Sequence, residues 1–136
     1  MIMTIEDLNG ILYAELSAAN LGLSGGIYFD NERPLDSKLE DIAINTPALN
    51  GMAGHPQNGY SNLNIYVPQM RVKVGGKQRL VRDRLREKDL VEKVTAVVEN
   101  MQVEGVNYVE SERKEQSADG GESFVNVRVF WNIYYL

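Results

Sequence analysis

The sequence contains no cysteine and only one histidine, His55, among its 136 residues. The first absence excludes disulfides, thiol catalysis and thiolate metal sites. The second excludes a metal site built from several histidines. No run of about 18 apolar residues occurs, so the sequence predicts no membrane span. Glu6 and Asp7 stand where a signal peptide needs a basic segment, so we expect a chain that is made and folded in a cytoplasm.

Charge is distributed unevenly along the chain. The net charge of −5 argues against general nucleic-acid binding, because that binding depends on basic surface. The window 71–88 nevertheless holds eight basic residues against two acidic ones, a net of +6, so the rest of the chain sums to −11. A basic patch on one copy could thus face an acidic patch on the next. The length and the hydrophobic fraction of 43% predict one globular domain over residues 1–136.

Two segments have helical periodicity. Thr4 is a predicted N-cap with Asp7 as its capping-box partner, and apolar residues follow at three- and four-residue steps, so we expect a helix over residues 4–19. A longer pattern of the same kind predicts a second helix over residues 79–101. Its apolar positions are Leu80, Val81, Leu85, Val91, Val94, Val98 and Met101.

The remaining apolar segments are short or alternate with polar residues, which is typical of strands. Loops are expected over residues 30–34 and over the Gly/Pro/Asn-rich residues 46–59. The predicted class is α+β, a mostly antiparallel sheet with two helices packed on one face, in the order α-β-β-β-α-β-β. The predicted strands cover residues 26–29, 42–44 and 60–67, a ribbon over 69–77 that Gly75-Gly76 breaks, and a hairpin over 106–111 and 124–136 with a turn at 119–121.

The terminal strand has two different faces. Its odd-numbered residues are apolar and form the natural core face: Val125, Val127, Val129, Trp131, Ile133 and Tyr135. Its even-numbered residues mix polar side chains with the aromatic residues Phe124, Phe130 and Tyr134. An uncovered face of this kind would be an apolar patch. We therefore expect either the first helix or a partner to cover it.

No arrangement of residues suited to catalysis is found. His55 lies in a Gly/Pro-rich loop without a carboxylate or serine placed to orient it, so we interpret it as an ordinary loop residue. The segment 74–77 lacks the frame of a phosphate-binding loop. An acidic cluster consists of Asp30, Glu32, Asp36, Glu40 and Asp41. Its spacing does not match a calcium loop. We predict that the protein is not an enzyme and uses no metal or cofactor.

The basic run 71–88 admits three interpretations. It can be a solvated helix face that carries Arg/Glu pairs. It can also contact an acidic surface on another copy of the chain, or it can contact nucleic acid, although no aromatic residues are interleaved with its bases. The alternative function from this segment is a small peptide- or nucleic-acid-binding module.

Two blocks of sequence carry a resemblance to known proteins. Residues 33–45 (RPLDSKLEDIAIN) and residues 64–68 (NIYVP) resemble small proteins encoded in prophages and related mobile elements. The predicted element order resembles the phage tail-terminator (tail-completion) family and related head–tail joining proteins. The motifs cover about twenty residues, whereas the order covers most of the chain.

The resemblance implies a structural role without enzymatic activity or cofactors. Such proteins form rings, commonly hexamers, that cap a growing tail tube and later join it to the head. The implied partners are copies of the chain, the tail-tube protein and head–tail connector proteins, with no membrane and with nucleic acid only in passage. The implied location is the host cytoplasm during assembly and then the virion tail.

In that family, extended loops reach the neighbouring subunit or the tube. The segments able to do so here are residues 30–41, 46–59 and 69–78. The predicted interface residues are Arg33, Asp36, Glu40, Asp41, Arg71, Lys73, Lys77, Arg79, Phe124, Phe130 and Tyr134.

Overall fold

The computed structural model describes residues 3–51, 56–102, 106–117 and 122–133. Its first helix, α1 (Ile5–Ala18), begins at the predicted N-cap. The Thr4 hydroxyl accepts a bond from the Asp7 backbone N–H at 3.1 Å, and the Asp7 carboxylate accepts one from the Thr4 N–H at 2.8 Å. This capping box satisfies two N–H groups that a helix start would otherwise leave unpaired. The predicted first helix is confirmed to within a residue at each end.

The second helix, α2 (Arg84–Glu99), is shorter than predicted, and the prediction for residues 79–83 was wrong. Residues Lys77–Val81 form a strand, β5, which pairs with β4 (Met70–Val74) as a two-stranded ribbon. Gly75 and Gly76 join the strands with positive φ angles of 57° and 80°. A two-residue turn of this hand matches the twist of paired strands, and it extends the predicted ribbon to Val81.

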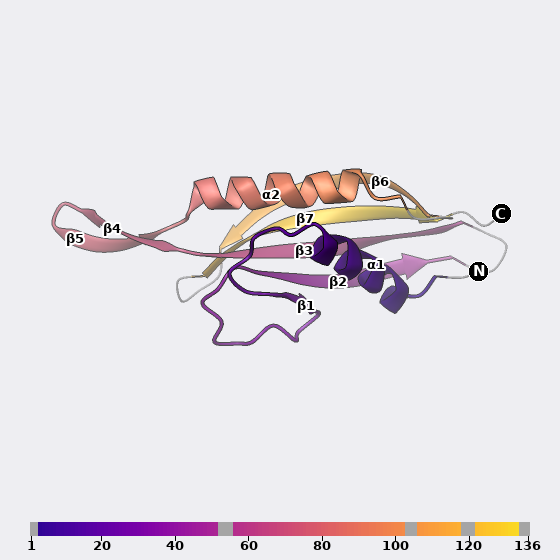
Figure 1. Cartoon of the computed structure of the whole chain (residues 1–136), viewed down its shortest axis with the longest axis horizontal. Helices are drawn as coiled ribbons and strands as arrows, with labels where there is room; N and C mark the ends of the chain where they lie inside the picture. The colour runs from indigo at the N-terminus through magenta and orange to yellow at the C-terminus, as the bar shows by residue number, and fades with distance from the viewer. Residues whose placement is uncertain (1–2, 52–55, 103–105, 118–121, 134–136) are drawn as a thin grey trace.

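Five strands form the main sheet, in the spatial order β1-β2-β3-β7-β6 (Figure 1). Among the described strands of this sheet, β1 pairs in parallel with β2, and the other pairs are antiparallel. The α+β class is therefore confirmed, and the chain order becomes α-β-β-β-β-β-α-β-β because the ribbon adds two strands. The strands are β1 (Ile27–Phe29), β2 (Asp41–Asn50), β3 (Gln57–Pro68), β6 (Val106–Ser117) and β7 (Glu122–Ile133).

The core lies between one face of this sheet and both helices, as predicted. Odd-numbered residues of β3 and β7 lie opposite one another in register, as Leu63 does with Val127. They pack with Leu12 of α1 and Leu90 of α2 in a single apolar cluster. The period of two in a strand places every such residue on the same face, which is why both helices lie there.

A chain of buried hydrogen bonds crosses this core. The Trp131 indole N–H donates to the Ser61 hydroxyl at 2.7 Å, and Thr46 donates its hydroxyl proton to the Asn9 amide oxygen at 2.7 Å. The Ser61 and Thr46 oxygens are 2.6 Å apart, so Ser61 donates to Thr46. This chain links α1 to three strands and fixes their register, because a slip would leave buried polar groups unpaired.

The prediction of a loop over residues 46–59 was wrong for most of this segment. Residues 46–50 continue β2, and residues 57–59 begin β3. Pro47 is tolerated because it lies at a bulge between Asn45 and Ala48, where the missing N–H breaks no regular ladder bond. Gly59 is required because a Cβ there would lie 2.2 Å from the Ala48 carbonyl oxygen. These residues therefore permit close strand pairing instead of ending it.

The substitution Gly59→Ala should destabilise the fold by about 2 kcal/mol or more, since the Cβ would meet backbone that cannot move aside. The matched control is Gly10→Ala on the exposed face of α1, where an added Cβ meets nothing within 4 Å. That variant should gain about 0.5–1 kcal/mol from helix propensity. Thermal unfolding measures both, at roughly 3–5 °C per kcal/mol. Equal melting temperatures for the two variants would contradict the assigned β2–β3 pairing.

Candidate functional site

The ribbon of β4 and β5, called the arm below (residues 70–81), projects beyond one end of the main sheet (Figure 1). It contains no acidic residue and four basic ones: Arg71, Lys73, Lys77 and Arg79. All four are exposed, and none pairs with a carboxylate among the residues that the structure describes. The structure thus brings these four predicted interface residues together on one projecting element.

The arm also exposes apolar side chains. Met70, Val74 and Leu80 are 42%, 50% and 48% exposed. Because residues opposite each other in a strand pair share a face, Val74 lies beside Lys77, and Leu80 lies beside Arg71. Both faces of the arm therefore combine positive charge with apolar surface.

The helical part of the basic run has a different role. The Arg82 guanidinium contacts the Glu87 carboxylate at 2.8 Å, and both side chains are largely buried. Lys88 lies 3.7 Å from Glu92 one turn along α2. The exposed Lys88–Glu92 pair is of the kind that the first interpretation of the run describes, whereas Arg82 precedes α2 and its pair with Glu87 is buried instead of solvated. The run therefore divides into a paired helical half and the arm.

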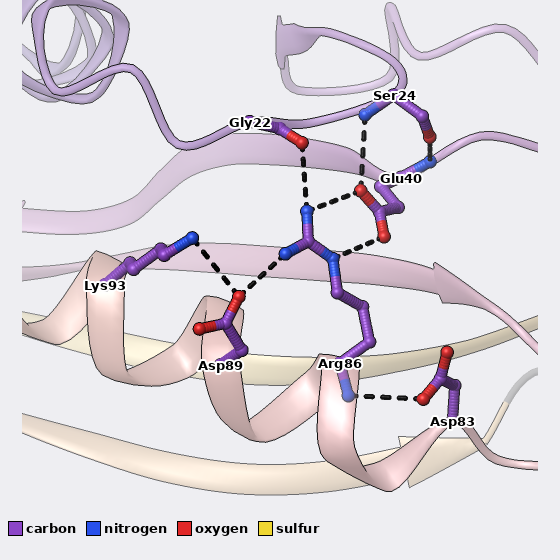
Figure 2. A network of polar contacts seen from close by, with 7 residues as sticks. All are labelled: Gly22, Ser24, Glu40, Asp83, Arg86, Asp89 and Lys93. Carbon is purple, nitrogen blue, oxygen red and sulfur yellow. Dashed lines mark hydrogen bonds and ion pairs between the residues drawn. The ribbon is translucent and has the colours of Figure 1, made fainter.

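Arg86 is the centre of a polar network that joins α2 to the chain before β2 (Figure 2). Its Nε and Nη2 donate to the two Glu40 oxygens at 2.6 and 2.8 Å, and Nη2 also donates to the Gly22 carbonyl at 2.9 Å. Nη1 donates to Asp89 at 2.7 Å. A two-pronged contact of this kind is the strong form of an Arg–carboxylate pair. Glu40, predicted as an interface acid, is thus bound within its own subunit.

Asp41 is also bound within the subunit. Its carboxylate is fully buried and accepts bonds from the Gly26 N–H at 2.9 Å, from Arg33 Nε at 3.0 Å and from the Ser37 hydroxyl at 2.5 Å. The Arg33 guanidinium also lies 3.8 Å from the centre of the Tyr66 ring. Arg33 and Asp41, both predicted interface residues, therefore fasten the segment between β1 and β2 onto the sheet.

The segment so fastened, called the acidic loop below (residues 30–39), presents the remaining predicted acid. A turn closes between the Pro34 carbonyl and the Ser37 N–H at 3.1 Å. Leu35 and Asp36 lie at its tip, and Leu35 is 100% exposed. Asp30 and Glu32 are also exposed, and none of the three carboxylates pairs with a cation among the described residues.

Neither helix covers the sheet face that carries Phe124 and Phe130, because both pack on the opposite face. The expectation that the first helix covers this face was therefore wrong. The side chains of this face pack against each other. Phe124 lies 5.1 Å from Tyr66, and Phe130 lies 6.4 Å from Tyr60, between ring centres. The Asn126 amide donates to Asn62 and Asn64 on β3 at 3.2 and 2.8 Å. Tyr134 lies outside the described residues.

Two other segments were considered as sites in the sequence, those around His55 and Gly75-Gly76. His55 lies outside the described residues, and Gly75-Gly76 form the hairpin turn of the arm. Within the described ranges, no three His, Cys, Asp or Glu side chains come together as a metal site would require. The helices described here include none that is long and apolar enough to cross a membrane.

The chain matches no model of a protein family, and no curated protein is significantly similar to it in sequence.

The Arg86–Glu40 pair was missed at the sequence level, because the two residues are separated by 46 positions. The local signal was only that Arg86 belongs to the basic run and Glu40 to the acidic cluster. Opposite charges in these two segments suggested contact between copies, whereas this pair forms the contact inside one copy.

The Glu40 pair predicts a pH-dependent stability. Hydrogen bonding to Arg86 lowers the pKa of Glu40 below its ordinary value of 4.5. The carboxylate therefore adds stability that is full above that value and is lost as the pH falls through the lower folded pKa. Glu40→Gln should cost about 1–2 kcal/mol at neutral pH, since the pair is partly solvated.

The difference between Glu40→Gln and the wild type should shrink as the pH falls below the ordinary Glu pKa, because the wild-type carboxyl then becomes neutral too. Urea unfolding at neutral and acidic pH measures this. The matched control is Glu92→Gln, which alters the exposed pair with Lys88 and should cost less than about 0.5 kcal/mol. A Glu40→Gln deficit that does not change with pH would contradict the charged pair.

Proposed function

We propose that the chain is a structural subunit of a phage-derived tail or head–tail junction, a tail terminator that assembles with copies of itself into a ring and caps the tail tube. The observation that carries the proposal is the arm. It projects away from the core and combines four exposed cations with exposed apolar side chains. A surface of this composition suits contact with another protein.

The stability of the arm supports a binding role. A two-stranded ribbon alone is marginally stable in water, because it buries little apolar surface. The arm is paired only within itself, apart from its attachment to β3 and α2. Contact with a neighbouring subunit would cover its apolar side chains and add stability. In a ring one surface of each copy contacts a different surface of the next one, and a projecting element is suited to such a contact.

The proposed mechanism is assembly without chemistry. The arm engages the adjacent subunit, and the completed ring presents one surface to the tail-tube protein and another to the connector. Once the ring covers the end of the tube, further tube subunits have no site to bind. Capping of the tube therefore depends on shape and charge complementarity. It would take place in the host cytoplasm during assembly, and the ring would afterwards be part of the virion tail.

A second candidate function is a peptide- or nucleic-acid-binding module that uses the arm. The observation that favours it is that residues 70–81 carry four basic and no acidic side chains. Phosphate contacts of such a segment would make binding strongly dependent on salt. Salt-dependent binding of a short DNA at near-physiological ionic strength, without self-association, would favour this function over the first.

Light scattering tests the assembly proposal. The wild type at about 0.1 M salt should have a mass well above that of one chain, and the mass should fall at about 1 M salt, because salt screens the cations of the arm. Lys73→Gln combined with Lys77→Gln should weaken self-association at least tenfold.

The control is Lys88→Gln combined with Lys93→Gln, which removes the same charge from exposed, locally paired positions on α2. It should leave the mass unchanged. A wild type that stays monomeric at high concentration and does not bind tail-tube protein would overturn the proposed function.

A further inference from the structure

The arm needs a receptor surface of opposite charge that also offers apolar side chains. Several acids on the described part of the chain are already bound, as Glu40, Asp41 and Glu87 are to arginine. The acidic loop differs from these. Its three exposed carboxylates, on Asp30, Glu32 and Asp36, are close together in the sequence and accompany two exposed leucines, Leu35 and Leu39.

We propose that the arm of one copy docks on the acidic loop of a second copy. This inference rests on the proposed function and names the surface that the arm binds. Charge complementarity carries the argument, because the arm holds four cations, whereas the exposed charges of the loop are three carboxylates and Lys38. The apolar side chains of both surfaces lie among these charges, so charge pairing and apolar burial occur in one contact.

The acidic loop is prepared for binding before a partner arrives. The buried Asp41 carboxylate holds Arg33 and Ser37, and the turn at Pro34 places Leu35 outward. The Arg86–Glu40 contact holds the end of the loop against α2 (Figure 2). A surface that is already ordered loses less conformational entropy on binding than a flexible one.

We take the partner to be a second copy, because the described strands of the arm do not pack on the strands that flank the loop of the same chain. Within one chain the arm follows β3 and extends past the end of the sheet, whereas the acidic loop connects β1 to β2, the strand next to β3 (Figure 1). Neither strand of the arm packs on β1 or β2. Arm and loop are therefore free to form contacts between copies at the same time.

Charge reversal tests the pairing. The arm variant carries Lys73→Glu and Lys77→Glu, and the loop variant carries Glu32→Lys and Asp36→Lys. Each alone should lose self-association by on the order of 100-fold in Kd at about 0.1 M salt, since like charges would then meet. A one-to-one mixture of the two variants should associate again, because each reversed arm meets a reversed loop.

Two controls separate this contact from general charge effects and from misfolding. The double variant Glu6→Lys, Glu99→Lys makes the same charge change as the loop variant, but at exposed helix positions, and should associate like the wild type. Leu35→Ser removes a side chain that is 100% exposed in one copy. It should therefore leave thermal unfolding of the chain unchanged at high salt, while it weakens association about tenfold.

The outcomes distinguish the two proposals. If the arm variant fails to associate while the loop variant associates like the wild type, the loop is not the receptor and the assembly function stands. A mixture that stays monomeric also overturns the pairing. If the wild type does not associate at all, both the proposed function and the pairing fail.

Discussion

Two consecutive carboxylates hold the acidic loop in place on the rest of the molecule. Glu40 and Asp41 stand at the start of β2, where successive side chains point in opposite directions. Glu40 therefore reaches Arg86 on α2, while Asp41 reaches Arg33 and Ser37 beside Tyr66 on the other face. The segment between β1 and β2 is short of apolar residues and could not pack by itself. These two ionic contacts hold the segment in one conformation. The outward positions of Leu35 and Asp36 depend on that conformation.

The uncovered sheet face is stabilised by its own side chains. Because the strands place their aliphatic residues toward the helices, the other face receives asparagine, arginine and aromatic groups. Arg128 donates to Asn62 at 3.3 Å and lies 4.4 Å from the Tyr60 ring centre, so even its charge is used within the sheet. Phe124 and Phe130 are consequently half-buried without a second molecule. Like Arg33, Glu40 and Asp41, these two predicted interface residues therefore have partners within their own subunit.

Sequence patterns were sufficient where one local rule decided the structure. The alternation in β7, the capping box at Thr4 and the helical spacing from Val91 onward each predicted the observed element, because burial and backbone geometry act on neighbouring residues. Residues 46–59 were mistaken for a loop because Gly59 and Pro47 are explained only by the strand lying next to them. The internal roles of Glu40 and Asp41 were missed for a similar reason, since charge patterns do not reveal which partner lies closest in space.

The arm is a separate two-stranded sheet, and its exposed side chains do not contribute to the core of the main sheet. Its glycine turn and its valines favour a β-ribbon. Its exposed apolar side chains would contribute hydrophobic stabilisation only when a contact removes them from water. Its cations would speed encounter and select a partner, whereas burial of Met70, Val74 and Leu80 would supply affinity. Arm and acidic loop are different surfaces, so a contact between two copies leaves one arm and one loop unfilled. In the proposed assembly, addition would continue until the last arm meets the first loop, and a ring of fixed size would form where the rotation between successive copies closes.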